Sequence, residues 1–131
     1  MSQGDGTLLI VEYDQRFADT LALEFRDRGY RVECLDGLEA VAQKSHLSYR
    51  YAVIDLWLHP ESGLDVISLF KTRSPSTVIA ALAGYHGGKT AQRAIELGAT
   101  ACLTKPVDID LLEKALLSGD PRVKLPEYRN G

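Results

Sequence analysis

The stretch at residues 51–55 reads YAVID, four apolar residues followed by an aspartate. A continuous apolar run of this length is typical of a strand that is buried on both faces of a sheet. Similar runs lie at residues 8–11, 78–82 and 100–103. Polar and apolar residues alternate at 31–35 instead, which predicts a strand at a sheet edge that is covered on one face.

Amphipathic segments lie between these runs. Four of them carry apolar stripes at helical spacing, and each stripe can pack on a sheet. The stripes are Phe17, Leu21 and Phe25; Leu64, Ile67 and Phe70; Ala91, Ala94, Ile95 and Gly98; and Leu111, Leu112, Ala115 and Leu116.

Signals for helix starts and ends agree with these stripes. Asp36 and Ser62 are each followed three residues later by an acid, which is the spacing of a capped helix start. Gly29 and Gly98 stand where helices should end. Strand and helix alternate five times, which predicts a parallel sheet with helices on both faces. In such folds the functional residues lie at the carboxyl ends of the strands.

The composition of the 131 residues, with 45% hydrophobic and 25% charged residues and a net charge of -3, predicts one soluble globular domain. Its bases are scattered singly, which argues against direct nucleic-acid binding by this segment. The sequence contains no apolar stretch of membrane-spanning length and no signal peptide, so we expect no membrane association and a cytoplasmic location.

Cys34 and Cys102 lie in apolar stretches, where we expect buried free thiols rather than a disulfide.

Charged residues follow three of the predicted strands. Glu12 ends the first, Asp55 the third, and Lys105-Pro106 follows the fifth, whereas Ala83-Gly84 ends the fourth. Two carboxylates and an ammonium group are therefore expected in one crevice. Strands commonly finish in polar residues, so the spacing alone leaves chance placement open.

Five segments in this order resemble the receiver domain of two-component response regulators: LIVE at 9–12, AVIDLWL at 52–58, SGLD at 62–65, LAGY at 82–85 and LTKP at 103–106. The resemblance covers residues 7–118, and we expect a flexible N-terminus at 1–6 and a tail or linker at 119–131. It implies a flavodoxin-like doubly wound (βα)5 fold with a five-stranded parallel sheet in the order 2-1-3-4-5. The likeness is greatest to receivers of redox-responsive DNA-binding regulators, and an excised domain and a stand-alone receiver both fit the sequence.

This resemblance implies phosphorelay signalling rather than enzyme activity. Asp55 would accept a phosphoryl group from a sensor histidine kinase or phosphotransfer protein, and Lys105 would pair with the acceptor. Receivers hold Mg²⁺ with two adjacent acids that end the first strand, the acceptor and a backbone carbonyl, here that of Trp57. The expected ligands are therefore Glu12, Asp55 and Trp57.

Three positions depart from the receiver pattern. Tyr13 replaces the second acid, so we expect the metal site to be weak or absent, with Mg²⁺ binding weakened. Ala83 replaces the hydroxyl at the end of the fourth strand, and Cys102 replaces the aromatic switch residue. Asp14 could replace the missing ligand, but we favour a role as the cap of the following helix. The hypothesis is an atypical receiver with its acceptor kept and its metal site and switch degraded.

Tyr13, Asp14, Trp57 and Tyr85 are expected at the rim of the crevice. Trp57 could shield the acceptor, contact a partner or be incidental. An alternative function is a phosphorylation-independent interaction module, with a homodimer through the fourth helix, fifth strand and fifth helix as one form of it. A flavodoxin-like cofactor binder is a remote alternative, because the acidic loop after the first strand would repel a phosphate group.

Overall fold

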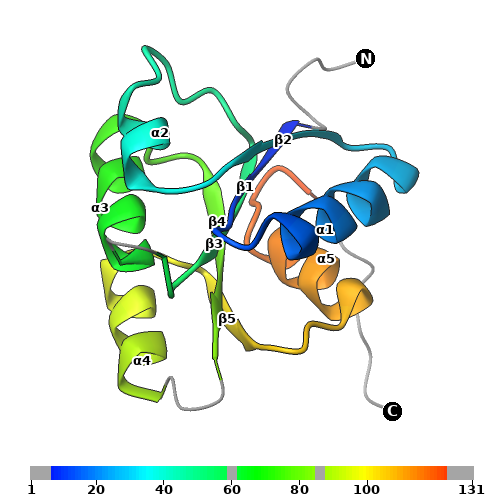
Figure 1. Ribbon diagram of the computed structural model, residues 1–131. Helices are drawn as coiled ribbons and strands as arrows, with labels where there is room; N and C mark the ends of the chain where they lie inside the picture. The colour runs from blue at the N-terminus through cyan, green and yellow to red at the C-terminus, as the bar shows by residue number, and fades with distance from the viewer. Residues whose placement is uncertain (1–6, 59–61, 85–87, 124–131) are drawn as a thin grey trace.

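The computed structural model describes residues 7–58, 62–84 and 88–123. A single parallel sheet with the strand order β2-β1-β3-β4-β5 forms its centre, as the receiver resemblance predicts (Figure 1). The predicted strands match the observed ones to within one residue at each end. The observed strands are β1 (Thr7–Val11), β2 (Arg31–Leu35), β3 (Tyr51–Asp55), β4 (Val78–Ala83) and β5 (Ala101–Thr104).

Helices cover both faces of the sheet. Figure 1 shows α1 and α5 on one face and α2, α3 and α4 on the other. Each face therefore has its own apolar core, because successive strand residues point to opposite faces. Leu8 and Ile10 of β1 pack under α1 and α5, whereas Leu9 and Val11 pack under α2 to α4. The helices are α1 (Gln15–Asp27), α2 (Leu38–Ala42), α3 (Gly63–Arg73), α4 (Gly88–Leu97) and α5 (Ile109–Ser118).

The two edge strands differ from the three inner ones. Strands β1, β3 and β4 are buried almost throughout, whereas Val32 to Leu35 of β2 are half-buried, as predicted for an edge strand. The prediction that 100–103 is buried on both faces was wrong, because Ala101 to Leu103 are half-buried and Thr104 is exposed. An apolar run cannot by itself reveal that its strand comes last in the sheet and lacks a neighbour.

Three of the four predicted helix signals are confirmed. The Oγ atom of Ser62 accepts a hydrogen bond from the Leu64 amide at 3.0 Å, and Gly29 and Gly98 end α1 and α4 with φ of 97° and 127°. Those left-handed φ values favour glycine. The Asp36 cap was wrong, because α2 begins after Gly37, with an extended backbone and no capping side chain.

In α4 and α5, the apolar stripe predicted from the sequence is wider than the face of the helix that is buried. Ile95 of α4 is 45% exposed and Leu111 of α5 is 56% exposed, contrary to the prediction that they pack on the sheet. The neighbouring residues Ala94 and Leu112 point inward instead. One residue step turns a side chain by 100° around a helix, and in these two helices that step carries Ile95 and Leu111 away from the sheet.

The chain beyond α5 packs on the start of β3. Asp120 is buried, and its carboxylate accepts hydrogen bonds from the Tyr51 hydroxyl and the Arg50 Nε, both at 2.7 Å. The Arg122 Nε donates to the other carboxylate oxygen at 2.8 Å. Residues 119–123 are therefore held against the domain, and the assignment of 119–131 as a tail or linker stays a prediction.

Within the described residues, none of the helices has the length and apolar character needed to cross a lipid bilayer.

Candidate functional site

Asp55 is the last residue of β3, and its carboxylate is fixed from two sides. The Trp57 amide donates to Oδ1 at 2.9 Å, and the Lys105 ammonium contacts Oδ2 at 2.8 Å. The start of α3 lies directly against this strand end, because the Gly63 amide donates to the Leu56 carbonyl at 3.1 Å. A Cβ atom at Gly63 would overlap the Asp55 carbonyl oxygen, so glycine is needed for this close approach.

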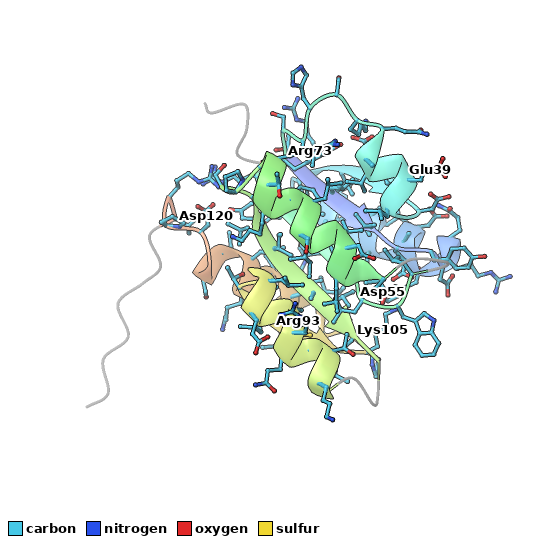
Figure 2. All side chains as sticks on the ribbon, turned by 90° about the vertical axis from the view of Figure 1, so that its left-hand side faces the viewer. Glu39, Asp55, Arg73, Arg93, Lys105 and Asp120 are labelled. Atoms are coloured by element: carbon cyan, nitrogen blue, oxygen red, sulfur yellow. The ribbon has the colours of Figure 1, made fainter. Side chains whose placement is uncertain are left out.

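Lys105 reaches the same point from the loop after β5. Its amide donates to the Ala83 carbonyl at 2.9 Å, which anchors the loop to the end of β4. Its ammonium group contacts Glu12 Oε1 at 3.2 Å as well as Asp55, and it lies 4.5 Å from the centre of the Phe17 ring. Figure 2 shows Asp55 and Lys105 near one another at one end of the sheet. The convergence expected from the strand ends is present.

Glu12 completes a three-residue charged group with Asp55 and Lys105. Its side chain is buried, and Oε2 accepts a hydrogen bond from the Asp14 amide at 3.0 Å. Burial, followed by the hydrogen bond and charge of Asp55, raises the pKa of Glu12 to about 7, while the Asp14 amide and Lys105 act in the opposite direction. Burial alone would lower the pKa of Lys105, but hydrogen bonds and charges from Asp55 and Glu12 outweigh it and raise that pKa.

Asp14 caps α1, as predicted. Its Oδ1 atom accepts hydrogen bonds from the Arg16 amide at 3.0 Å and the Phe17 amide at 3.3 Å. These contacts satisfy amide groups that have no partner within the helix. One oxygen of the Asp14 carboxylate is thereby engaged at the helix start.

The charged group opens onto a cavity of about 280 Å³. Its lining combines the three charged side chains with residues of the surrounding loops. The side chains at the rim are prominent, since Tyr13 is 56% and Trp57 is 71% exposed. Tyr85, also expected at the rim, lies outside the described residues. The lining consists of Glu12, Tyr13, Asp14, Asp55, Trp57, Gly84 and Lys105.

The two expected switch positions point into the core. Ala83 is buried in the apolar cluster on the α2 to α4 side of the sheet, and Cys102 packs against the same cluster. Burial raises the pKa of the Cys102 thiol. Cys34 and Cys102 are free thiols, as expected, but both are half-buried rather than fully buried.

The donor groups do not fit a tight magnesium site. Both oxygens of Glu12 and both oxygens of Asp55 already accept a hydrogen bond or contact Lys105. Magnesium prefers several oxygen ligands in octahedral geometry, but a lysine ammonium lies between the two carboxylates. Across residues 7–58, 62–84 and 88–123, no group of three or more His, Cys, Asp or Glu side chains is placed to hold a metal ion.

Phe17 and Gly63 are parts of the site to which the sequence reasoning gave no role there. Phe17 belongs to the apolar stripe of α1 and was expected only to pack on the sheet, but its ring also faces the Lys105 ammonium. Its position three residues after the Asp14 cap places it in the first helical turn beside the strand ends. That position is the signal that could have revealed its contact with the site.

Comparison with known proteins agrees with this geometry. A family described as "Response regulator receiver domain" matches residues 8–117. The chain is 39% identical over 125 residues to "Acid tolerance regulatory protein ActR" of Rhizobium meliloti, covering 94% of this chain and 64% of that protein. It is 37% identical over 125 residues to "Photosynthetic apparatus regulatory protein RegA" of Rhodovulum sulfidophilum, covering 93% and 67%. The chain thus spans about two thirds of the length of these relatives.

Solved structures show the same fold. A response regulator from Burkholderia pseudomallei, described with a phosphorylated aspartic acid, calcium ion and citrate, superposes with a TM-score of 0.77 at 30% identity, covering 86% of this chain and 66% of that one. The receiver domain of Francisella response regulator 1452 gives a TM-score of 0.74 at 21% identity, covering 86% and 93%. The second likeness concerns the fold alone.

Proposed function

The chain belongs to the response regulator receiver domain family, and we propose that it accepts a phosphoryl group on Asp55 from a sensor histidine kinase or a phosphotransfer protein. Receiver domains are signalling modules of two-component regulators rather than typical enzymes. The observation that carries the proposal is the 2.8 Å contact between Asp55 Oδ2 and Lys105 Nζ at the edge of an open cavity.

In the proposed reaction, a carboxylate oxygen of Asp55 attacks the phosphorus atom of a phosphohistidine. The new oxygen–phosphorus bond forms as the phosphorus–nitrogen bond breaks, and the leaving imidazole nitrogen takes a proton from water. Phosphoryl transfer depends chiefly on positioning and on charge stabilisation. The Trp57 amide fixes the attacking carboxylate, and Lys105 balances the charge that gathers on the phosphoryl oxygens.

Receiver domains generally use Mg²⁺ for phosphorylation. Here the available ligands are the Glu12 and Asp55 carboxylates and the Trp57 carbonyl, and they support only weak Mg²⁺ binding because Tyr13 supplies no carboxylate and Lys105 lies between the two acids.

The proposed receiver has a degraded switch. Ala83 offers no hydroxyl to a phosphoryl oxygen, and Cys102 offers no aromatic ring to rotate with it. Both side chains are packed in the core instead. We therefore propose that phosphorylation changes the charge around Lys105 with little movement of β4 and β5. We also propose that the domain works in the cytoplasm.

The test is incubation with acetyl phosphate, with and without Mg²⁺, followed by mass spectrometry of the intact protein. The expected result is a mass increase of one phosphoryl group that is lost in Asp55→Asn and kept in Asp65→Asn, an exposed aspartate on α3. If the unmodified chain gains no phosphoryl group with or without Mg²⁺, the proposal is wrong.

A second function, phosphorylation-independent association, is supported by apolar side chains beside the edge strand. Ile95 on α4 and Leu111 on α5 are exposed, and α4 and α5 lie on the two sides of the half-buried β5 (Figure 1). These elements would form the homodimer surface. Analytical ultracentrifugation without any phosphodonor should then show a dimer that Ile95→Lys dissociates. The matched control is Leu23→Lys, which changes an exposed leucine on α1, and a monomer throughout would exclude this homodimer.

A further inference from the structure

A larger cavity of about 690 Å³ lies at the amino end of the sheet, away from Asp55. Thr7 at the start of β1, Arg50 just before β3 and Ser76 just before β4 line it. Figure 2 shows Arg73 and Asp120 toward this end of the molecule and Asp55 and Lys105 toward the other. Nothing in the proposed phosphorylation chemistry uses this cavity.

Three arginines from three separate parts of the chain line the cavity: Arg50 before β3, Arg73 at the end of α3 and Arg122 after α5. Two of them are held by one buried carboxylate. Asp120 contacts the Nε atoms of Arg50 and Arg122 at 2.7 and 2.8 Å, one on each of its oxygens. The Tyr51 hydroxyl, at 2.7 Å, fixes the carboxylate in turn. These guanidinium groups are ordered before any ligand arrives, which lowers the entropy cost of binding.

The third arginine is fixed independently. Arg73 Nη1 donates to the Ala42 carbonyl at 3.0 Å, which ties the end of α3 to the last residue of α2. Its guanidinium therefore joins the cavity wall from the side opposite α5. Arginine presents several N–H donors in a rigid plane and is well suited to phosphate oxygens.

The charge around the cavity is positive. Among the residues that the structure describes, none of those lining the cavity is an aspartate or a glutamate. Asp120 pairs with two of the arginines, so one negative charge offsets part of the positive charge of three guanidinium groups. Ser45, Ser48, Ser74 and Ser76 line the same cavity, and serine hydroxyls can donate hydrogen bonds to an anion.

We propose that this cavity binds a small molecule that carries two or more linked phosphate groups, such as a nucleoside triphosphate or an inorganic polyphosphate. Its volume lies within the range of small-molecule sites, roughly 300–1,000 Å³. Arginines that come from three segments around a cavity of this size suit a chain of phosphates better than a single one. The proposal concerns a second site and is independent of phosphorylation at Asp55.

The first test is calorimetric titration of the full 131-residue chain with sodium tripolyphosphate in buffer without Mg²⁺. Parallel titrations with ATP and with inorganic phosphate distinguish a nucleotide, a bare polyphosphate and a single phosphate. We expect saturable binding of tripolyphosphate or ATP, with inorganic phosphate at least tenfold weaker. ¹⁵N-HSQC spectra should show shifts of the backbone amides of residues 73, 74, 76 and 122 rather than of residues 55 and 105.

The decisive variants change charge at the cavity wall. Arg73→Gln should weaken binding about tenfold or more, since a hydrogen bond to a charged group contributes on the order of 1.5–3 kcal/mol. Ser76→Asp adds a negative charge at an exposed residue of the turn between α3 and β4. It tests the effect of charge on binding with little effect on folding, and it should also weaken binding at least tenfold. Arg93→Gln, on the exposed face of α4, is the matched control and should bind as the unmodified chain does.

Three results would overturn the proposal. They are the absence of saturable binding, equal weakening by Arg93→Gln and Arg73→Gln, and spectral shifts confined to the Asp55 crevice. The second would indicate a general electrostatic attraction, and the third would place the anion on Lys105.

Discussion

Two buried carboxylates lie at opposite ends of β3, and their surroundings differ. Asp55 ends the strand, whereas Asp120 binds the hydroxyl of Tyr51, the first residue of the strand. Each contacts a cationic side chain at 2.7 or 2.8 Å. Each oxygen of Asp120 accepts two hydrogen bonds from its own domain, whereas Asp55 faces a cavity and shares its lysine with Glu12.

This difference separates a structural acid from a reactive one. Arg122, Tyr51 and Arg50 outweigh burial and hold the pKa of Asp120 well below its usual range. The pKa of Glu12, beside Asp55, is shifted in the opposite direction, because burial and the neighbouring Asp55 raise it. A buried acid that its surroundings satisfy stabilises the fold, whereas acids that share one counter-charge beside a cavity stay available to a ligand.

The largest expected effect is on the structural side. Asp120→Ala leaves the Arg50 guanidinium, whose side chain is 10% exposed, without its carboxylate, and breaking such a buried pair costs about 3–5 kcal/mol. Urea unfolding measures this loss. Asp27→Ala, at an exposed aspartate of α1, should change stability by less than about 0.5 kcal/mol. A loss below about 1 kcal/mol for Asp120→Ala would show that the two acids do not differ in this way.

A smaller effect is expected at the reactive end. Lys105→Met leaves the Glu12 and Asp55 carboxylates facing one another, and we expect a loss of about 2 kcal/mol, since the lysine side chain is partly exposed and the cavity admits water. Adding Asp55→Asn should recover part of that loss, and a double-mutant cycle measures the coupling. Lys89→Met, at an exposed lysine of α4, serves as the control. Additive effects of the two changes would contradict a shared counter-charge.

The dependence of stability on pH at low pH tests the charge of Asp120 with a substitution, Asp120→Asn, that keeps the size of the side chain. Because its pKa in the folded state lies below the unfolded value of about 3.9, its contribution is complete above that value and is lost as the pH falls toward the folded pKa. Below about pH 5, the unfolding free energy of the Asp120→Asn variant should therefore fall less than that of the unmodified protein, by on the order of 1–2 kcal/mol. Denaturant titrations across this pH range measure the slope, and parallel curves for the two proteins would contradict the assignment.

The smallest expected effect concerns Asp14, an acid at the cavity rim that caps a helix. Asp14→Ala should cost about 1 kcal/mol through loss of the cap while leaving acetyl phosphate labelling of Asp55 unchanged. Asp14→Ser retains a capping oxygen and should restore most of the stability. If Asp14→Ala lowers the labelling at saturating Mg²⁺ and Asp14→Ser does not restore it, Asp14 belongs with the reactive acids.

Much of the fold was predictable because it depends on local patterns. The run at residues 51–55 and its three counterparts marked strands to within one residue, and Ser62, Gly29 and Gly98 marked helix ends correctly. The errors came from features that a local pattern lacks. The edge position of β5, the outward turn of Ile95 and Leu111 and the missing cap at Asp36 all depend on which neighbours are present.

The sequence by itself determined that Glu12, Asp55 and Lys105 meet, because parallel strands bring their carboxyl ends to one edge of a sheet. It also determined that Tyr13, Ala83 and Cys102 stand where the receiver pattern has other chemistry. Only the tertiary structure decided how the charges pair. Asp120 follows Tyr51 by 69 positions, and such long-range contacts depend on how α5 and the chain after it pack across the start of β3. The same packing brings Arg50, Arg73 and Arg122 around one cavity, which no spacing in the sequence indicates.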